Sequence, residues 1–322
     1  MKIHYTYAMK SIERILIILN PTAGKGKAGQ HREEIEGLLQ AAGVNYDIKL
    51  TERPGHATEI ARLAGSEGYA VAVAGGGDGT VNEVINGLIL AGIEGKPVCE
   101  LGVLPVGRGN DFAYGADIPK DLADSIAVLV GSYKRPLDVG LIKGGDYPGG
   151  KHFGNGIGVG FDTIVGLEAA KMRRVQGFMA YVLGALKTFI IYPLAPLVEI
   201  RFNGSTITQK SHQISIMNGK RMGGTFFMAP QARNNDGQLD LCMAGELSRS
   251  SMISLMVHYT KGTQAQHPSI RIDRAPSYQI SAPEGGLIVH ADGETICTNG
   301  RALSVECLPG KLTIRCQESI AG

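Results

Sequence analysis

The sequence predicts an α/β protein of two parts: a doubly wound parallel-sheet domain over residues 1–137 and a mostly antiparallel β-sandwich domain over residues 138–308. Strand and helix patterns alternate through the first third, which is typical of a parallel sheet covered on both faces. After Arg135-Pro136, short β-prone runs and glycine-rich turns take over. The 322 residues, 43% of them hydrophobic, suffice for two packed cores. Whether the C-terminal tail, residues 309–322, packs back on the first domain is left open by the sequence.

The first domain is predicted to alternate four strands with four helices. The strands are Ile15–Leu19, Tyr46–Leu50, Val71–Ala74 and Leu101–Pro105. The helices are His31–Ala42, Ala57–Glu67, Val81–Leu90 and Leu122–Val130. Ligands of such sheets bind beyond the carboxyl ends of the strands, and the glycine-rich turns of this domain fall there. Those turns are therefore the candidate site.

The second domain is predicted from short strands that end at turn residues. The examples are Val198–Phe202 before Asn203-Gly204, Gln213–Met217 before Asn218-Gly219, and Leu239–Ala244. One helix, roughly Thr163–Ile191, is expected to interrupt them. Its apolar stretch is broken by Lys187 and is shorter than the about 20 residues that span a bilayer. A core helix with a solvated basic end is favoured over a membrane-interface helix.

Composition excludes one class of partner and indicates a compartment. A formal net charge of +2 and the absence of tryptophan argue against nucleic acid as a partner. Five scattered cysteines without a Cys-x-x-Cys pair favour reduced thiols over disulfides or zinc. The first apolar run leads straight into Asn20-Pro21, so no signal peptide is recognised. We expect a cytoplasmic protein, and leave peripheral contact with the inner membrane surface and a homodimer open.

The turn Gly75–Thr80 carries the strongest single signal for a ligand. It stands between an apolar strand and a helix, and reads Gly-Gly-Gly-Asp-Gly-Thr. Glycines let the backbone approach phosphate oxygens, and the N–H groups of a helix N-terminus favour anions. Because Asp78 places a carboxylate among those phosphates, the turn predicts ATP bound with a metal ion.

Two further turns end strands of the same sheet. Residues Asn20–Lys27 suit phosphate contact but are not a P-loop, because Gln30-His31 stands where Lys-Ser/Thr is needed; a solvated turn is the alternative. The turn Gly107–Phe112 lacks the third glycine of a dinucleotide fingerprint, so NAD binding is weakly supported. Asn110-Asp111 has a simple interpretation as a helix cap. The sharper interpretation brings Asp78 and Asp111 to one Mg²⁺-nucleotide.

Two acidic turns lie in the second domain. Asp236-Gly237 is most simply a hairpin turn. Asp292-Gly293-Glu294 is open to the same simple interpretation, or to that of an acid pair at a turn tip. In the latter case a glutamate within hydrogen-bond reach of an alcohol acts as its general base.

Seven motifs in one order are far more specific than any of them alone. They are Asn20–Gly24, Gly75–Thr80, Leu104–Ala113, Leu137–Gly140, Phe153–Asn155, Asn235–Gly237 and Asp292–Glu294. Together they resemble the diacylglycerol kinase catalytic family, which includes bacterial soluble lipid kinases and is related to sphingosine and ceramide kinases. The resemblance runs from Ile15 to about Cys316, nearly the whole chain.

The resemblance implies an ATP-dependent lipid kinase with ATP and Mg²⁺ as cofactors and a lipid alcohol as substrate. The nucleotide would sit in the first domain, and the lipid hydroxyl between the domains. The positions that match the family's nucleotide-binding residues are Asn20, Pro21, Thr22, Ala23, Gly24, Thr51, Gly75, Gly76, Gly77, Asp78, Gly79 and Thr80. The usual threonine before the Asn-Asp pair is replaced by Arg108, which is expected to reach a phosphate or an anionic headgroup instead.

The resemblance also implies roles for acidic residues. The positions that match those organising Mg²⁺ and phosphates are Asp78, Asp111 and Asp138. Glu294 matches the general base, with Asp292 as its supporting partner. Asp236 matches the side-chain ligand of a structural Mg²⁺ in some bacterial members, which the carbonyls of Arg233 and Gln238 would complete.

Two other functions compete with the lipid kinase. Related folds share the Gly-Gly-Asp-Gly core, so a kinase of a soluble hydroxyl compound such as NAD remains open. A nucleotide-binding regulatory protein without turnover is the third hypothesis; the altered position at Arg108 favours it, whereas the presence of Asp78, Asp111 and Glu294 argues against it. The Asn-Asp-Phe and Asp-Gly-Glu elements favour the lipid kinase.

Overall fold

The computed structural model describes residues 13–26, 29, 31–165 and 194–318. Within these ranges, no helix is long and apolar enough to cross a membrane. The predicted helix Thr163–Ile191 lies outside the described residues, apart from 163–165, which are helical. Its assignment to core or membrane interface therefore stays a prediction.

The N-terminal part is built on a parallel sheet whose strand order is β2-β1-β3-β4. The strands are β1 (Arg14–Leu19), β2 (Asn45–Leu50), β3 (Val71–Gly76) and β4 (Glu100–Pro105). The helices are α2 (Arg32–Ala41), α3 (His56–Ala64), α4 (Asp78–Ile93), α5 (Asp111–Gly115) and α6 (Leu122–Val130), with a 3₁₀ turn, η1 (Ala23–Lys25). All eight predicted elements are confirmed within a few residues.

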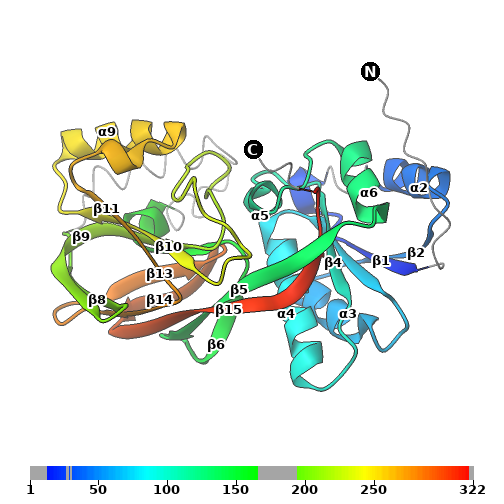
Figure 1. The fold of residues 1–322 in the computed structure, drawn as a ribbon, viewed down its shortest axis with the longest axis horizontal. Helices are drawn as coiled ribbons and strands as arrows, with labels where there is room; N and C mark the ends of the chain where they lie inside the picture. The colour runs from blue at the N-terminus through cyan, green and yellow to red at the C-terminus, as the bar shows by residue number, and fades with distance from the viewer. Residues whose placement is uncertain (1–12, 27–28, 30, 166–193, 319–322) are drawn as a thin grey trace.

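Helices lie on both faces of this sheet, which makes it doubly wound (Figure 1). Alternate side chains of β1 enter different cores. Leu16 and Ile18 of β1 pack in the core that contains α3 and α4. Ile15 and Ile17 pack in the core that contains α2 and α6. Side chains of a strand alternate between its two faces, so a strand buried on both sides has a continuous apolar sequence. The apolar runs in the sequence have this cause.

The second part is a sandwich of mostly antiparallel strands around its own apolar core. Its strands are β6 (Tyr147–Phe153), β7 (Gly156–Gly160), β8 (Leu197–Phe202), β9 (Ser205–Met217), β10 (Leu239–Gly245), β11 (Ile270–Ala275), β12 (Ser277–Ser281), β13 (Leu287–Ala291) and β14 (Glu294–Gly300). The predicted turn at Asn203-Gly204 is confirmed, because both residues have positive φ, 47° and 73°, and join β8 to β9. Positive φ at both positions is the requirement of a type I′ hairpin.

Two long strands connect the parts (Figure 1). Strand β5 (Lys134–Gly144) pairs with β15 (Ala302–Arg315) in antiparallel register, and β15 also pairs with β12. At its far end β15 meets the parallel sheet, where Ile314 lies opposite Leu101 of β4. One hydrogen-bonded path therefore runs from the parallel sheet into the sandwich, and the predicted boundary at 137/138 falls inside β5.

Two predictions for the second part are wrong. A helix beyond the single one expected, α9 (Arg249–Lys261), follows β10. The run of serines at its start resembles a loop, but the side chain of Ser248 accepts a bond from the Ser251 N–H and caps the helix, which ends at Gly262 with φ of 69°. A short 3₁₀ turn, η2 (Gln264–Gln266), comes next.

The second error concerns Asn218-Gly219, which is not a hairpin turn. Asn218 is buried, and its side-chain amide donates to the carbonyls of Asp138 and Gly154 at 2.9 and 2.7 Å. A Cβ on Gly219 would meet Asn155 Oδ1 at 2.1 Å. The dipeptide serves close packing between segments far apart in sequence, which local turn statistics do not include.

Candidate active site

The ends of β1 and β3 meet at the Gly75–Thr80 turn. The Asn20 N–H donates to the Gly75 carbonyl at 2.9 Å. The Asn20 side chain donates to Thr80 Oγ1 at 3.2 Å and accepts from the Thr22 N–H at 3.0 Å. The Thr51 N–H is bonded to the Leu19 carbonyl, which places the end of β2 beside the end of β1. The structure thus brings the predicted nucleotide-binding positions of three strand ends together.

Glycine is required in this turn by close packing. A Cβ on Gly76 would lie 2.3 Å from Thr80 Oγ1, and one on Gly107 would lie 2.2 Å from the Cα of Gly77. Real Cβ atoms do not approach other atoms so closely. The Gly107 N–H also donates to the Gly76 carbonyl at 3.1 Å. The loops after β3 and β4 therefore lie in backbone contact, as the sequence analysis expects for neighbouring strand ends.

Asp78 and Asp111 converge beside Gly109. The position of a Cβ on Gly109 would be 2.9 Å from Asp78 Oδ2 and 3.4 Å from Asp111 Oδ2. Asp78 Oδ1 accepts from the Phe112 N–H at 3.0 Å, at the start of α5. Asp111 is buried and accepts from the Gly224 N–H at 3.0 Å. The interpretation of Asn110-Asp111 as a helix cap is wrong in one respect: Asn110 is the N-cap residue of α5, but its side chain makes no cap bond, and Asp78 accepts from the first turn instead.

Burial raises the pKa of Asp78, against the backbone N–H groups that lower it. Burial, with the nearby Asp78 charge as the second cause, raises the pKa of Asp111 to about 7. The Arg221 guanidinium lies 2.9 Å from Asp111 and offsets part of the negative charge of the pair. Mg²⁺ prefers one or two carboxylates together with phosphate oxygens. The donor set therefore fits a Mg²⁺-nucleotide.

The acid turn lies between β13 and β14. Asp292 has φ of 46° and Gly293 of 84°, a left-handed pair that reverses the chain directly before Glu294. Glu294 Oε2 binds Lys151 Nζ at 2.8 Å, and the glutamate side chain is 41% exposed. The carboxylate is thus held by one cation while remaining accessible to a substrate.

The Asp292 side chain binds backbone N–H groups in the turn after β6 and at the start of β7. Its carboxylate accepts from the N–H groups of Gly154, Asn155 and Gly156 at 2.7, 3.1 and 2.9 Å. It also accepts from Asn82 Nδ2 at 2.8 Å. Burial raises the pKa of Asp292, and these donors act in the opposite direction. Any support that Asp292 gives to Glu294 is therefore through the position of the turn.

Two residues of this arrangement were missed by the sequence analysis. Asn82 lies in the first turns of α4, directly after the glycine-rich turn, and also donates to the His152 carbonyl at 3.2 Å. Its signal was present, since a buried asparagine is unusual in a helix interior and requires a partner. Lys151 gave no signal, because its contact with Glu294 depends on how distant strands pair.

The remaining predicted acidic residues gather elsewhere, around β5 and β15. Both oxygens of the buried Asp138 are bonded to backbone, to the N–H groups of Gly237 and Gly310, each at 2.7 Å. Asp236 accepts from the Gln238 N–H at 3.1 Å and forms an ion pair with Arg274. Arg274 thus pairs with the carboxylate expected to hold the structural Mg²⁺, and that metal site stays a prediction. Arg233 is exposed.

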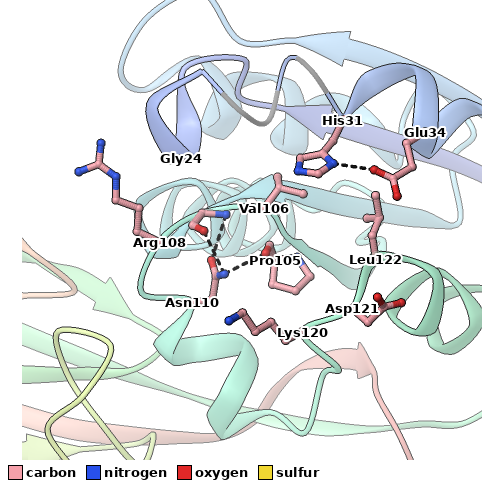
Figure 2. A pocket seen from close by; sticks show the side chains of 11 residues that line it. Gly24, His31, Glu34, Pro105, Val106, Arg108, Asn110, Lys120, Asp121 and Leu122 are labelled. Carbon is pink, nitrogen blue, oxygen red and sulfur yellow. Dashed lines mark hydrogen bonds and ion pairs between the residues drawn. The ribbon is translucent and has the colours of Figure 1, made fainter. Parts of the chain in front are cut away.

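Arg108 lines a cavity of about 520 Å³ together with Gly24, from the turn after β1. Figure 2 shows Arg108 on the side of Gly24, with Lys120 below and the His31–Glu34 pair opposite. Asn110 forms part of the wall, and its amide donates to the Pro105 carbonyl at 2.8 Å. Arg108 therefore remains beside the turns predicted to bind the nucleotide.

Comparisons with known proteins agree with this arrangement. A model of the diacylglycerol kinase catalytic domain matches residues 14–142. A model of the YegS C-terminal NAD kinase beta sandwich-like domain matches residues 155–316. Among curated proteins, a diacylglycerol kinase of Staphylococcus aureus (strain bovine RF122 / ET3-1) is 29% identical over 285 residues, 88% of this chain and 86% of that protein. The diacylglycerol kinase of Bacillus subtilis (strain 168) is 28% identical, over 88% of this chain and 90% of its own.

A solved structure shows the same fold. It is that of a protein of Bacillus anthracis str. Sterne proposed to be a diacylglycerol kinase, with a TM-score of 0.78 and 23% identity over 99% of this chain and 100% of that one. The predicted fold class, a parallel-sheet domain followed by an antiparallel sandwich, is confirmed. The two domain models and the curated relatives together establish the family: the chain belongs to the diacylglycerol kinase family of lipid kinases.

Proposed function

We propose that the protein transfers the γ-phosphate of ATP to the hydroxyl of a diacylglycerol-like or sphingoid lipid, with Glu294 as general base. The observation that carries this proposal is the 2.8 Å bond from Asn82 to Asp292. Asn82 belongs to the helix that opens with the glycine-rich turn, and Asp292 to the turn before Glu294. The bond supports the proposal because it joins the helix behind the glycine-rich turn to the turn that carries Glu294.

The glycine-rich turn would hold the nucleotide phosphates. Its backbone comes within reach of a ligand because residues 75–77 carry no side chains, and α4 begins directly behind it. Phosphoryl transfer depends on positioning and on neutralisation of charge more than on covalent catalysis. Asp78 and Asp111 would hold Mg²⁺, which when bound supplies neutralisation of phosphate charge.

Glu294 would take the proton of the acceptor alcohol. Lys151 restricts the orientation of the Glu294 carboxylate through the 2.8 Å contact. Asp292 holds the turn against residues 154–156 and so fixes where the base stands. A positioned general base contributes about 10²–10⁴-fold to a rate.

Partly buried apolar side chains near the carboxylate pair suit the lipid chains. Met222 and Phe226 pack against an apolar core cluster. Met222 stands two residues before Gly224, whose N–H binds Asp111. Methionine side chains adapt to varied apolar ligands.

The test is transfer of labelled phosphate from Mg-ATP to mixed micelles that contain diacylglycerol or a sphingoid base. Glu294→Gln should lower the rate about 10²–10⁴-fold while binding of ATP is retained. Glu284→Gln is the matched control, because Glu284 is exposed in the loop before β13. Transfer to water-soluble alcohols alone would refute the lipid substrate, and full activity of Glu294→Gln would refute the base. Chelation of divalent cations should abolish transfer by the wild-type protein.

A further inference from the structure

A loop of the sandwich domain reaches across to the nucleotide-binding loop. It follows β9 and contacts α5, which lies at the edge of the parallel-sheet domain (Figure 1). Arg221 of this loop donates through Nε to Asp111 Oδ1 at 2.9 Å and through Nη2 to the Gly109 carbonyl at 3.1 Å. Its guanidinium also lies 4.0 Å from the ring centroid of Tyr114.

The contact is enclosed. The side chain of Arg221 is 18% exposed and that of Asp111 is 7% exposed. A planar guanidinium that is bonded twice and stacked on a ring is restricted in orientation, and a charged pair shielded from water is weakly screened. Gly224 also holds this loop close to α5, because its N–H donates to both oxygens of Asp111 at 3.0 Å. The neighbouring Lys220–Asp117 pair also joins the domains, but at 3.4 Å and with 28% and 40% exposure.

The backbone of the same loop is bound to the acid turn through one residue. Asn155 Nδ2 donates to the Arg221 carbonyl at 2.9 Å, and the Asn155 carbonyl accepts from the Gly219 N–H at 2.7 Å. The Asn155 N–H in turn donates to Asp292 at 3.1 Å. A continuous series of bonds therefore runs from the turn before Glu294, through Asn155 and Arg221, to the loop that holds Asp111.

We propose that Arg221 is a positioning residue that couples the two halves of the site, fixing the Gly109–Asp111 loop at the distance from Glu294 that phosphoryl transfer requires. This role rests on the proposed function. Arg221 acts through Asp111 and the Gly109 carbonyl. Without Arg221 the nucleotide would still bind the glycine-rich turn, but the acceptor hydroxyl and the phosphate would no longer be held at the distance needed for transfer. A displacement of about 1 Å costs about 10²-fold in rate.

The kinetic test compares Arg221→Met with Lys220→Met, which removes the more exposed cation of the same loop. Arg221→Met should lower kcat for lipid about 10–100-fold, leave KM for ATP within about threefold, and raise the ratio of ATP hydrolysis to lipid phosphorylation about tenfold. Arg221→Lys should restore activity only in part, because an ammonium group lacks the planar fork. Lys220→Met should resemble the wild type. A kcat and hydrolysis ratio for Arg221→Met equal to those of Lys220→Met would overturn the proposal.

Hydrogen exchange gives a readout that does not depend on lipid turnover. In the wild type, a non-hydrolysable ATP analogue with Mg²⁺ should slow exchange at residues 109–115 and also at residues 154–156. Arg221→Met should keep protection near the glycine-rich turn and lose it at 154–156, whereas Lys220→Met should keep both. Equal protection of 154–156 in all three proteins would refute the coupling. A wild-type protein that shows this protection but phosphorylates no lipid would refute the proposed function and leave the coupling supported.

Discussion

Gly107 offers a sharp test of how the glycine-rich turns after β3 and β4 are positioned. The residue stands after β4 and faces the turn after β3. A Cβ there would lie 2.2 Å from the Cα of Gly77 and 2.8 Å from its nitrogen, both backbone atoms. Backbone does not rotate aside as a flexible side chain does. Gly107→Ala must therefore push the two loops apart.

The size of the effect follows from these distances. Carbon atoms in contact are most stable about 3.5–4.0 Å apart, so the loops must separate by about 1.5 Å. Overpacking of this kind costs about 1–3 kcal/mol of folding free energy. A displacement of about 1 Å in a site costs about 10²-fold in rate. We expect kcat/KM for ATP to fall about 100-fold, with a fall of roughly 2–4 °C in Tm for each kcal/mol.

The assay measures Tm, binding of ATP and the kinetics of phosphate transfer for Gly107→Ala beside Gly37→Ala. Gly37 lies in α2, is exposed, and has no atom within 4 Å of an added Cβ. Alanine there should raise stability by about 0.5–1 kcal/mol, since glycine is a poor helix former. If Gly107→Ala keeps wild-type Tm and kcat/KM, the loops are not in the backbone contact described above and the reasoning is refuted.

Three further predictions concern other contacts. Asn218→Ala leaves two buried carbonyls without a donor and should lower the free energy of unfolding in urea by about 2–4 kcal/mol, whereas the exposed Asn235→Ala should change it by less than about 0.5 kcal/mol. Burial lowers the pKa of His152, so the unfolded chain takes up the proton more readily; stability should fall as pH drops below about 6.5, and His152→Gln should weaken that fall. All five cysteines are buried free thiols, and burial raises the pKa of Cys242 and Cys307 to about 12. Ellman's reagent should therefore react with no thiol of the native protein within minutes, and with all five when the protein is unfolded in guanidinium. Rapid labelling of the native protein would contradict this.

The elements of the parallel sheet could be predicted from the sequence because their causes are local. A strand buried on both faces is apolar throughout, and a covering helix shows a period of 3.6 residues. Asn203-Gly204 was equally clear, since few residues accept positive φ at two consecutive positions. The helix α9 was missed because its serine-rich start has no apolar period, and only the Ser248 cap marks it.

The candidate site likewise has residues that local sequence predicts and contacts that only the fold creates. The sequence by itself determined the residue types of the glycine-rich turn and of the acid turn, because glycine, carboxylate and helix start occur there in an order that few other structures require. Only the tertiary structure decided that Asn82 joins these turns, that Lys151 holds Glu294, and that Arg221 reaches Asp111. Each of these contacts links segments at least 110 residues apart. Such pairs depend on how strands pair and how the two domains pack, and no local pattern encodes that.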